Sequence, residues 1–337
     1  MRIAIDGMGG DNAPAEIVKG CVESSKIIDH EIYIIGQEGR IRAELAKYSY
    51  EEGKIKIVHA EQIIEGDDAP VRAVRTKSDS SLVRGLNMVK NGEADLLISA
   101  GNTGAIMAGG LFILGRIPGI DRPAIASTYP ILGKGFSLMV DSGANAECKP
   151  NNLLEFATMG SIYMEKVFDI PKPTVGLVNI GVEEGKGTTV LKAVYELLKK
   201  SHLNFVGNVE ARDVPKGACD VIVCDGFVGN IILKLTEGLA WSILKLMKQK
   251  FTAGTIPKLG ALLLSGKLGE MKKEFDYSSY GGAPILGVKG ALIKIHGSSN
   301  ANAVKNAIIK AIPYVENQVV QMIQDSVLEL EEIVQSE

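Results

Sequence analysis

The sequence predicts an α/β fold built on a mostly parallel sheet, and two patterns support this. First, β-branched apolar runs alternate with amphipathic helical patterns along all 337 residues. Second, six of these runs lead directly into loops of Gly, Asn, Ser and Asp, which is typical of buried parallel strands. The six segments are Arg2–Pro14, Leu96–Ala105, Leu138–Asn145, Val175–Gly187, Val221–Asn230 and Ile293–Asn300. Because ligands of open α/β sheets bind beyond the carboxyl ends of the strands, these loops are the candidate site.

Apolar periodicity assigns the individual elements. We expect strands at Ile3–Asp6, Ile32–Ile35, Ile55–Val58, Leu96–Ser99, Ala124–Thr128, Phe136–Asp141, Val175–Ile180, Asn204–Val206, Val221–Asp225 and Ala291–Ile295. Helical spacing predicts helices at Ala13–Ile28, Val190–Lys200, Ala303–Ile312 and Glu316–Val334. Asn12 is the expected N-cap of the first helix, and Pro313 is expected to end the third. Since no Pro- or Ser-rich linker interrupts this order, residues 1–337 are predicted to form a single unit.

Composition restricts the class of protein. The net charge of −3 predicts no general affinity for nucleic acid or membrane. The N-terminus lacks the pattern of a signal peptide, and no run approaches the about 18 apolar residues of a membrane span. The four cysteines form no CxxC pair, which favours reduced thiols and a cytosolic location.

One segment, Glu237–Phe275, departs from the alternating pattern and predicts two amphipathic helices around a loop. It is rich in lysine, with seven lysines and two acidic residues between residues 245 and 274. One interpretation is a helical hairpin that packs on the core or on a second subunit. The other is a surface for an anionic membrane or an acidic protein, because consecutive exposed leucines are unusual on a soluble surface. The leucines expected to make membrane contact are Leu259, Leu262, Leu263 and Leu264.

The common nucleotide and hydrolase motifs are absent. No GxGxxG follows any strand, and Gly181–Gly187 is one residue too short for a P-loop and lacks its Ser or Thr. HExxH and GxSxG are absent as well. The remaining chemistry is anion binding by main-chain N–H groups, which phosphate suits well.

Two loops fit such an anion site. His296–Asn300 joins a strand to a helix, so that Ser298 and Ser299 could add hydroxyl donors and His296 could move a proton. Ala100–Gly104 is the second such loop. The alternative for both is an ordinary turn with capping side chains.

Other side chains at strand ends leave alternatives open. Asp6, Asp141 and Asp225 each close an apolar strand, where a carboxylate either caps a turn or faces the cleft; a metal site would need them to converge. Lys186 lies in a glycine-flanked loop and either reaches an anion or is simply solvated. Cys224 is a candidate thiol nucleophile, although the apolar residues around it favour a role as a small buried side chain.

Several longer motifs carry a family resemblance. They are AIDGMGGDNAP at the N-terminus, SAGNTGA, DRPAIA (Asp121–Ala126), DSGAN (Asp141–Asn145), VGLVNIG, CDGFVGN, GGAPILGVKG (Gly281–Gly290) and HGSSN. In this order, from residue 1 to about residue 310, the chain resembles the bacterial phosphate acyltransferases of the PlsX type. Ser142 departs from the family pattern, which has a hydrophobic residue before GAN.

The resemblance implies transfer of a long-chain acyl group from acyl carrier protein to inorganic phosphate, without an organic cofactor. We expect no metal ion at the site. The acyl phosphate product feeds a membrane glycerol-3-phosphate acyltransferase in phospholipid synthesis. The resemblance also implies a two-lobed, three-layer α/β/α fold with a Rossmann-like sheet, as in phosphotransacetylases and isocitrate and isopropylmalate dehydrogenases. It further implies a homodimer and peripheral attachment to the cytoplasmic membrane.

These loops and motifs together supply the candidate site. His296 and Lys186 are the predicted catalytic residues. They are expected to assist a direct attack of phosphate on the thioester, without an acyl-enzyme intermediate. The residues expected to bind phosphate or substrate are Asp6, Gly7, Asn12, Gly101, Asn102, Thr103, Asp141, Asn145, Asn179, Asp225, Asn230, Gly297, Ser298 and Ser299. Three alternatives remain: a phosphotransacetylase acting on short acyl-CoA, a dehydrogenase of the isopropylmalate type, and a non-enzymatic scaffold for acyl carrier protein.

Overall fold

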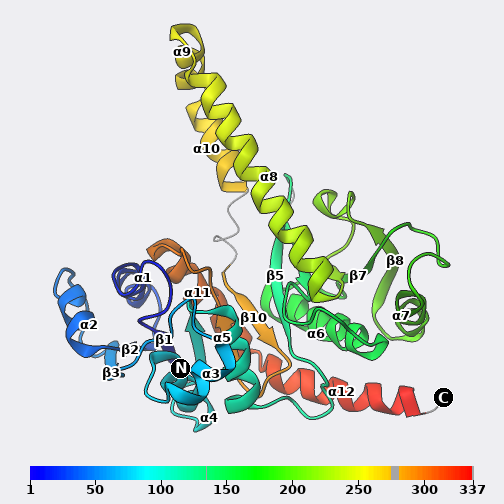
Figure 1. Cartoon of the computed structure of the whole chain (residues 1–337), viewed down its shortest axis with the longest axis horizontal. Helices are drawn as coiled ribbons and strands as arrows, with labels where there is room; N and C mark the ends of the chain where they lie inside the picture. Colours follow the sequence, from blue (N-terminus) through cyan, green and yellow to red (C-terminus); the bar gives the residue numbers. More distant parts are fainter. Residues whose placement is uncertain (134, 275–280, 336–337) are drawn as a thin grey trace.

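A computed structural model describes residues 1–133, 135–274 and 281–335, and within these ranges eleven strands form one sheet (Figure 1). The strand order across the sheet is β3-β2-β1-β4-β11-β10-β5-β6-β9-β7-β8. The strands are β1 (Arg2–Asp6), β2 (Glu31–Gly36), β3 (Ile55–His59), β4 (Leu96–Ser99), β5 (Ala124–Ile131), β6 (Gly135–Val140), β7 (Thr174–Asn179), β8 (Asn204–Glu210), β9 (Val221–Val223), β10 (Ala283–Leu286) and β11 (Ala291–Lys294).

The sheet is mostly parallel, as the sequence predicts. Among the described strands, seven neighbouring pairs run parallel and three run antiparallel. The antiparallel pairs involve β10 and β5 at the centre of the sheet, between its two parallel halves. The sequence analysis did not predict β10, because its four residues include Pro284 and follow Gly281 and Gly282.

Helices cover both faces of the sheet and give the expected three layers. One face carries α1 (Ala15–Ser25), α2 (Glu38–Leu45), α6 (Pro150–Phe168), α7 (Thr189–Lys200), α11 (Ala301–Glu316) and α12 (Val319–Gln335). The other carries α3 (Pro70–Thr76), α4 (Ser81–Lys90), α5 (Thr103–Gly109), which continues as η1 (Gly110–Leu114), together with η2 (Val214–Lys216) and the start of α8. Side chains alternate between the two faces along each strand, so that each face of the sheet has its own hydrophobic core. In β1, Ile3 and Ile5 pack into the core on the first face, and Ala4 packs into the core on the other.

The predicted cap of the first helix and the predicted end of the third are wrong, and the fourth helix begins at Val319 rather than Glu316. Asn12 does not cap α1, which begins at Ala15 with Pro14 as its N-cap; the Asn12 amide instead donates to the carbonyls of Ser298 and Ser299. Pro313 lies inside α11, which ends only at Glu316. Packing stabilises the last turn of α11 after Pro313, because Tyr314 is buried there with its ring 5.5 Å from that of Tyr163.

The predicted hairpin is present, and it starts earlier than expected. Helix α8 (Gly226–Thr252) leaves the sheet and projects away from it, and α9 (Thr255–Leu263) and α10 (Ser265–Glu274) return along it (Figure 1). Phe275, the expected end of the hairpin, lies outside the described residues. Leu262 and Leu263 at its tip are 69% and 80% exposed, as the sequence suggests.

Helix α8 also corrects an expectation about membrane spans. Among the described helices, α8 is long and apolar enough by length and composition to cross a membrane. The sequence of α8 contains no uninterrupted apolar run of this length, because Lys234 and Glu237 interrupt it. Length and composition alone are weak evidence for a span.

Candidate active site

A cavity of about 720 Å³ lies beyond the carboxyl ends of β1, β4 and β11. Gly10 and Asp11 after β1, residues 100–104 after β4, and His296 and Gly297 after β11 line one side of it. Ser142 and Gly143 after β6, together with Asn230 and Lys234 of α8, line the other side. Five of the six segments therefore contribute residues to this cavity, as expected for an open α/β sheet, and only Val175–Gly187 does not.

The loop after β4 and the first turn of the helix that follows line this cavity. Thr103 and Gly104 form the first turn of α5, and both line the cavity. Gly104 packs so closely that an added Cβ would lie 2.5 Å from Pro70. The predicted anion loop therefore lies at the amino end of α5, a position that generally favours anions.

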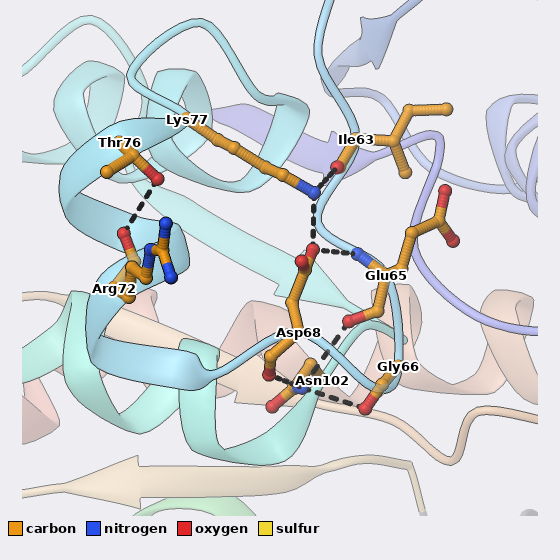
Figure 2. A network of polar contacts seen from close by, with 8 residues as sticks. All are labelled: Ile63, Glu65, Gly66, Asp68, Arg72, Thr76, Lys77 and Asn102. Carbon is orange, nitrogen blue, oxygen red and sulfur yellow. Dashed lines mark hydrogen bonds and ion pairs between the residues drawn. The ribbon is translucent and has the colours of Figure 1, made fainter.

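Asn102 joins this loop to a second wall of the cavity. Its Oδ1 accepts from the Ala105 N–H at 3.0 Å, which caps α5, and its Nδ2 donates to the carbonyls of Gly66 and Asp68 at 2.9 and 3.2 Å (Figure 2). The Lys77 ammonium holds the same segment through the carbonyl of Ile63 and the carboxylate of Asp68. Residues 64–66, which the sequence analysis did not single out, therefore form a fixed part of the site.

Asp6 braces two loops and does not line the cavity. Its Oδ1 accepts from the Met8 N–H, and its Oδ2 accepts from the Ser99 hydroxyl at 2.6 Å. Ser99 in turn accepts from the N–H of Gly101. Gly7 is also turned into the fold, because its N–H donates to the Ile35 carbonyl.

Asp141 has a similar internal role. Its fully buried carboxylate accepts from the N–H groups of Ile125, Gly143, Ala144 and Asn145, and from the Asn145 side chain. Burial raises the pKa of Asp141, and the surrounding N–H donors act in the opposite direction.

Asp225 caps α8 by accepting from the Val228 N–H. The three strand-end carboxylates therefore do not converge. Within the described residues, no group of three or more His, Cys, Asp or Glu side chains is placed to hold a metal ion.

The HGSSN segment, residues 296–300, contributes fewer residues to the main cavity than expected, and the amino end of α11 is not part of it. His296 and Gly297 line the main cavity. Ser299 lines a smaller adjoining cavity of about 90 Å³, and Ser298 lines neither of these two. The N-terminus of α11 is already occupied, because the Glu16 carboxylate accepts from the Ala301 N–H at 2.6 Å and Asn300 caps Ala303.

Ser298 orients His296. The Ser298 N–H donates to His296 Nδ1 at 3.2 Å, and the Ser298 hydroxyl lies 2.8 Å from the same atom. We therefore assign the proton of the neutral ring to Nε2. Burial, followed by the positive charges of Lys294 and Lys234, lowers the pKa of His296, so the ring is neutral near pH 7.

Two lysines at the site were missed from the sequence. Lys294, the last residue of β11, and Lys234 on α8 line both the main and the smaller cavity. Lys234 pairs with Glu237 at 2.8 Å. Burial, and then the charge of Lys234, lowers the pKa of Lys294. The available signal was a lysine within the otherwise apolar strand ALIKI.

Other predicted residues lie apart from the cavity. Lys186 is exposed in the loop after β7, and this loop is closed on itself by the Asn179 amide, which donates to the Lys186 carbonyl and to Asn208. Strand β9 separates β7 from β6, so the structure does not bring Lys186 or Asn179 to the cavity. Cys224 is buried, and burial raises its pKa well above the ordinary value.

Comparison with solved structures identifies the class of fold. A phosphotransacetylase from Streptococcus pyogenes aligns with a TM-score of 0.64 over 94% of both chains at 18% identity. A 4-hydroxythreonine-4-phosphate dehydrogenase from Klebsiella pneumoniae aligns with a TM-score of 0.55 over 93% of this chain and 98% of that one, at 12% identity. The chain therefore has the α/β fold that these enzymes share, as the family resemblance implies.

Sequence comparison identifies the family. Residues 1–322 match the family model described as "Fatty acid synthesis protein". The chain is 55% identical to a phosphate acyltransferase from Alkaliphilus oremlandii over 98% of both chains. It is 51% identical to one from Clostridioides difficile, covering 95% of this chain and 94% of the relative. The chain belongs to this phosphate acyltransferase family and is an acyltransferase of fatty acid and lipid synthesis, which confirms the resemblance seen in its motifs.

Proposed function

We propose that this protein transfers a long-chain acyl group from acyl carrier protein to inorganic phosphate, forming acyl phosphate for phospholipid synthesis. The observation that carries the proposal is the composition of the main cavity. One wall is the loop Gly101–Gly104 at the amino end of α5, and nearby are the cationic or N–H-donating side chains of Lys294, Lys234 and His296. This combination suits a phosphate dianion next to a carbonyl that becomes an oxyanion.

The proposed reaction is a direct attack of phosphate on the thioester carbonyl. Phosphate at the loop Gly101–Gly104 would be held by backbone N–H groups, so that positioning supplies much of the rate. The neutral His296 ring would donate its Nε2 proton in a hydrogen bond to the tetrahedral oxyanion. An acyl-enzyme on Cys224 is disfavoured, because the thiol is buried and its pKa is raised.

The decisive assay is release of free thiol from palmitoyl-acyl carrier protein, with acid-labile acyl phosphate measured in parallel. Thiol release that requires phosphate and yields an equal amount of acyl phosphate is the expected result. Phosphate-independent release would indicate a thioesterase. Turnover of acetyl-CoA without turnover of the carrier-protein thioester would instead favour the phosphotransacetylase whose fold the chain shares.

We further propose that the α8–α10 hairpin receives acyl carrier protein and touches the cytoplasmic face of the membrane. Its lysines suit the acidic surface of a carrier protein and anionic lipid headgroups alike. The exposed side chains of Ile256, Leu259, Leu262 and Leu263 suit insertion among acyl chains. This location would deliver a labile acyl phosphate to a membrane glycerol-3-phosphate acyltransferase.

Leu263→Glu tests the membrane part of this proposal. Binding to phosphatidylglycerol vesicles, measured by co-sedimentation, should be lost, because a carboxylate replaces an apolar side chain that is 80% exposed. Activity on soluble acyl carrier protein thioester should remain. Leu132→Glu, at a position 52% exposed elsewhere on the surface, is the control that should bind vesicles normally. Equal vesicle binding by wild type and Leu263→Glu would contradict the proposal.

A homodimer is also proposed, and helix α8 supports it. Phe227, Ile231, Leu235 and Leu239 recur at four-residue spacing on α8, and each is at least 47% exposed. Residues at this spacing lie on one face of a helix, so they form an apolar stripe. A second copy packing on this stripe would remove it from water, and sedimentation analysis of wild type against Leu235→Glu measures that association.

A further inference from the structure

Lys294 is a partly buried positive charge that faces the candidate site. Its side chain comes from β11, at the centre of the sheet, and lines both the main cavity and the smaller one that adjoins it. Within residues 1–133, 135–274 and 281–335, its ammonium group makes no hydrogen bond or ion pair, whereas Lys234 beside it pairs with Glu237. A partly buried cation without a partner is costly unless a ligand supplies the negative charge.

The proposed reaction contains one proton that must move. Near neutral pH the attacking species is hydrogen phosphate, a dianion that carries one proton. When its oxygen forms the C–O bond and the C–S bond breaks, the product acyl phosphate is a dianion without that proton, and the carrier leaves as a thiolate. One proton therefore passes from phosphate to sulfur, and the overall reaction neither takes up nor releases a proton.

We propose that Lys294 carries this proton: its ammonium group protonates the departing sulfur, and the resulting amine accepts the proton of the newly bound phosphate group. This inference rests on the proposed function. Lys294 and His296 then have different tasks: Lys294 transfers the proton, and His296 donates a hydrogen bond through Nε2. Ser298 fixes this orientation of His296 by donating to its Nδ1. Lys294 returns to its charged form in the same turnover, so no external acid or base is required.

The surroundings of Lys294 favour proton exchange. The charged groups that face it are Lys234 and Glu237 of α8, with His296 on its own segment and Asp11 beside His296. Burial is the largest effect on the Lys294 pKa and lowers it, the Lys234 charge lowers it further, and Glu237 opposes both. A pKa closer to the working pH makes an ammonium group a better proton donor to a leaving group.

Replacement by arginine separates proton transfer from charge. Arginine retains the positive charge but does not give up its proton in proteins, whereas methionine removes both. We expect Lys294→Met to lower kcat about 100-fold and to raise KM for phosphate. Lys294→Arg should restore KM for phosphate but leave kcat low. Lys289→Met, an exposed lysine in the preceding turn that lines neither cavity, is the matched control.

The assay uses the full-length protein with palmitoyl-acyl carrier protein and inorganic phosphate, across pH. In wild type, kcat should fall as pH rises above the lowered pKa of Lys294, and Lys294→Arg should lack this alkaline decrease. Full recovery of kcat in Lys294→Arg, or an unchanged kcat in Lys294→Met, would overturn the inference alone. A wild-type protein that forms no acyl phosphate would overturn the proposed function and this inference together.

Discussion

Replacing Asn102 by alanine tests whether the anion loop and the wall at residues 64–66 act as one structure. The substitution removes the cap on the Ala105 N–H, and loss of such a cap costs about 1 kcal/mol. It also removes two amide hydrogen bonds, to the carbonyls of Gly66 and Asp68, each contributing about 1 kcal/mol. We therefore expect the free energy of unfolding to fall by about 2–3 kcal/mol. KM for phosphate should rise, because both walls of the phosphate site lose their common support.

Urea denaturation followed by circular dichroism measures the stability, and the acyl phosphate assay measures KM. Asn102→Ser keeps an oxygen that can cap Ala105 but cannot reach the carbonyls, so its loss of stability should be intermediate. Thr188→Ala removes only the cap of α7, away from the cavity, and should leave KM for phosphate unchanged. The reasoning is refuted if Asn102→Ala has wild-type stability, or if Thr188→Ala raises KM equally.

Two further predictions concern buried titratable groups. Cys224→Ala should retain kcat, and no acyl group should be trapped on wild-type enzyme in a single turnover, because burial raises the pKa of this thiol; acyl-enzyme detected by mass spectrometry would contradict direct attack. Burial raises the pKa of Glu155 from 4.5 to about 7. Its contribution to stability is therefore present below pH 4.5 and is lost as pH rises through about 7, so wild type should lose stability relative to Glu155→Gln over that interval. Urea unfolding of both proteins across that range measures this, and a constant difference would argue against the shift.

The sequence predicted the layers and the loops because these depend on local patterns. Alternating apolar runs located most strands, and the glycine-containing loops after β4 and β11 both line the main cavity. The order of strands is not a local property. The loop after β7 looks as suitable for an anion as the loop after β4, but β9 lies between β7 and β6. Lys186 was therefore assigned to a site from which the strand order separates it.

The direction in which polar side chains point could also not be predicted from the sequence. Asn145 and Asn12 belong to motifs of the right composition, but long-range partners occupy them: Asn145 donates to the Pro123 carbonyl, and Asn12 to those of Ser298 and Ser299. Lys294 and residues 64–66 enter the site only because β11 pairs with β4 and Asn102 reaches back to Gly66. Such contacts join residues that are far apart in the chain.

The roles of the strand-end aspartates also bear on the proposal that the cavity binds a phosphate dianion. Asp6, Asp141 and Asp225 direct their oxygens to backbone N–H groups and to Ser99, so their negative charge is compensated inside the loops that they brace. Facing the cavity, Lys294 makes no hydrogen bond or ion pair among the described residues, although Glu237 lies near it, and the first turn of α5 borders the same space. A negatively charged ligand is the natural partner for both, since it offsets the desolvation of the lysine and binds the N–H groups of the helix. In the proposed function these three aspartates would brace the loops without facing the substrate, and a bound phosphate would offset the cost of placing a lysine at the end of β11.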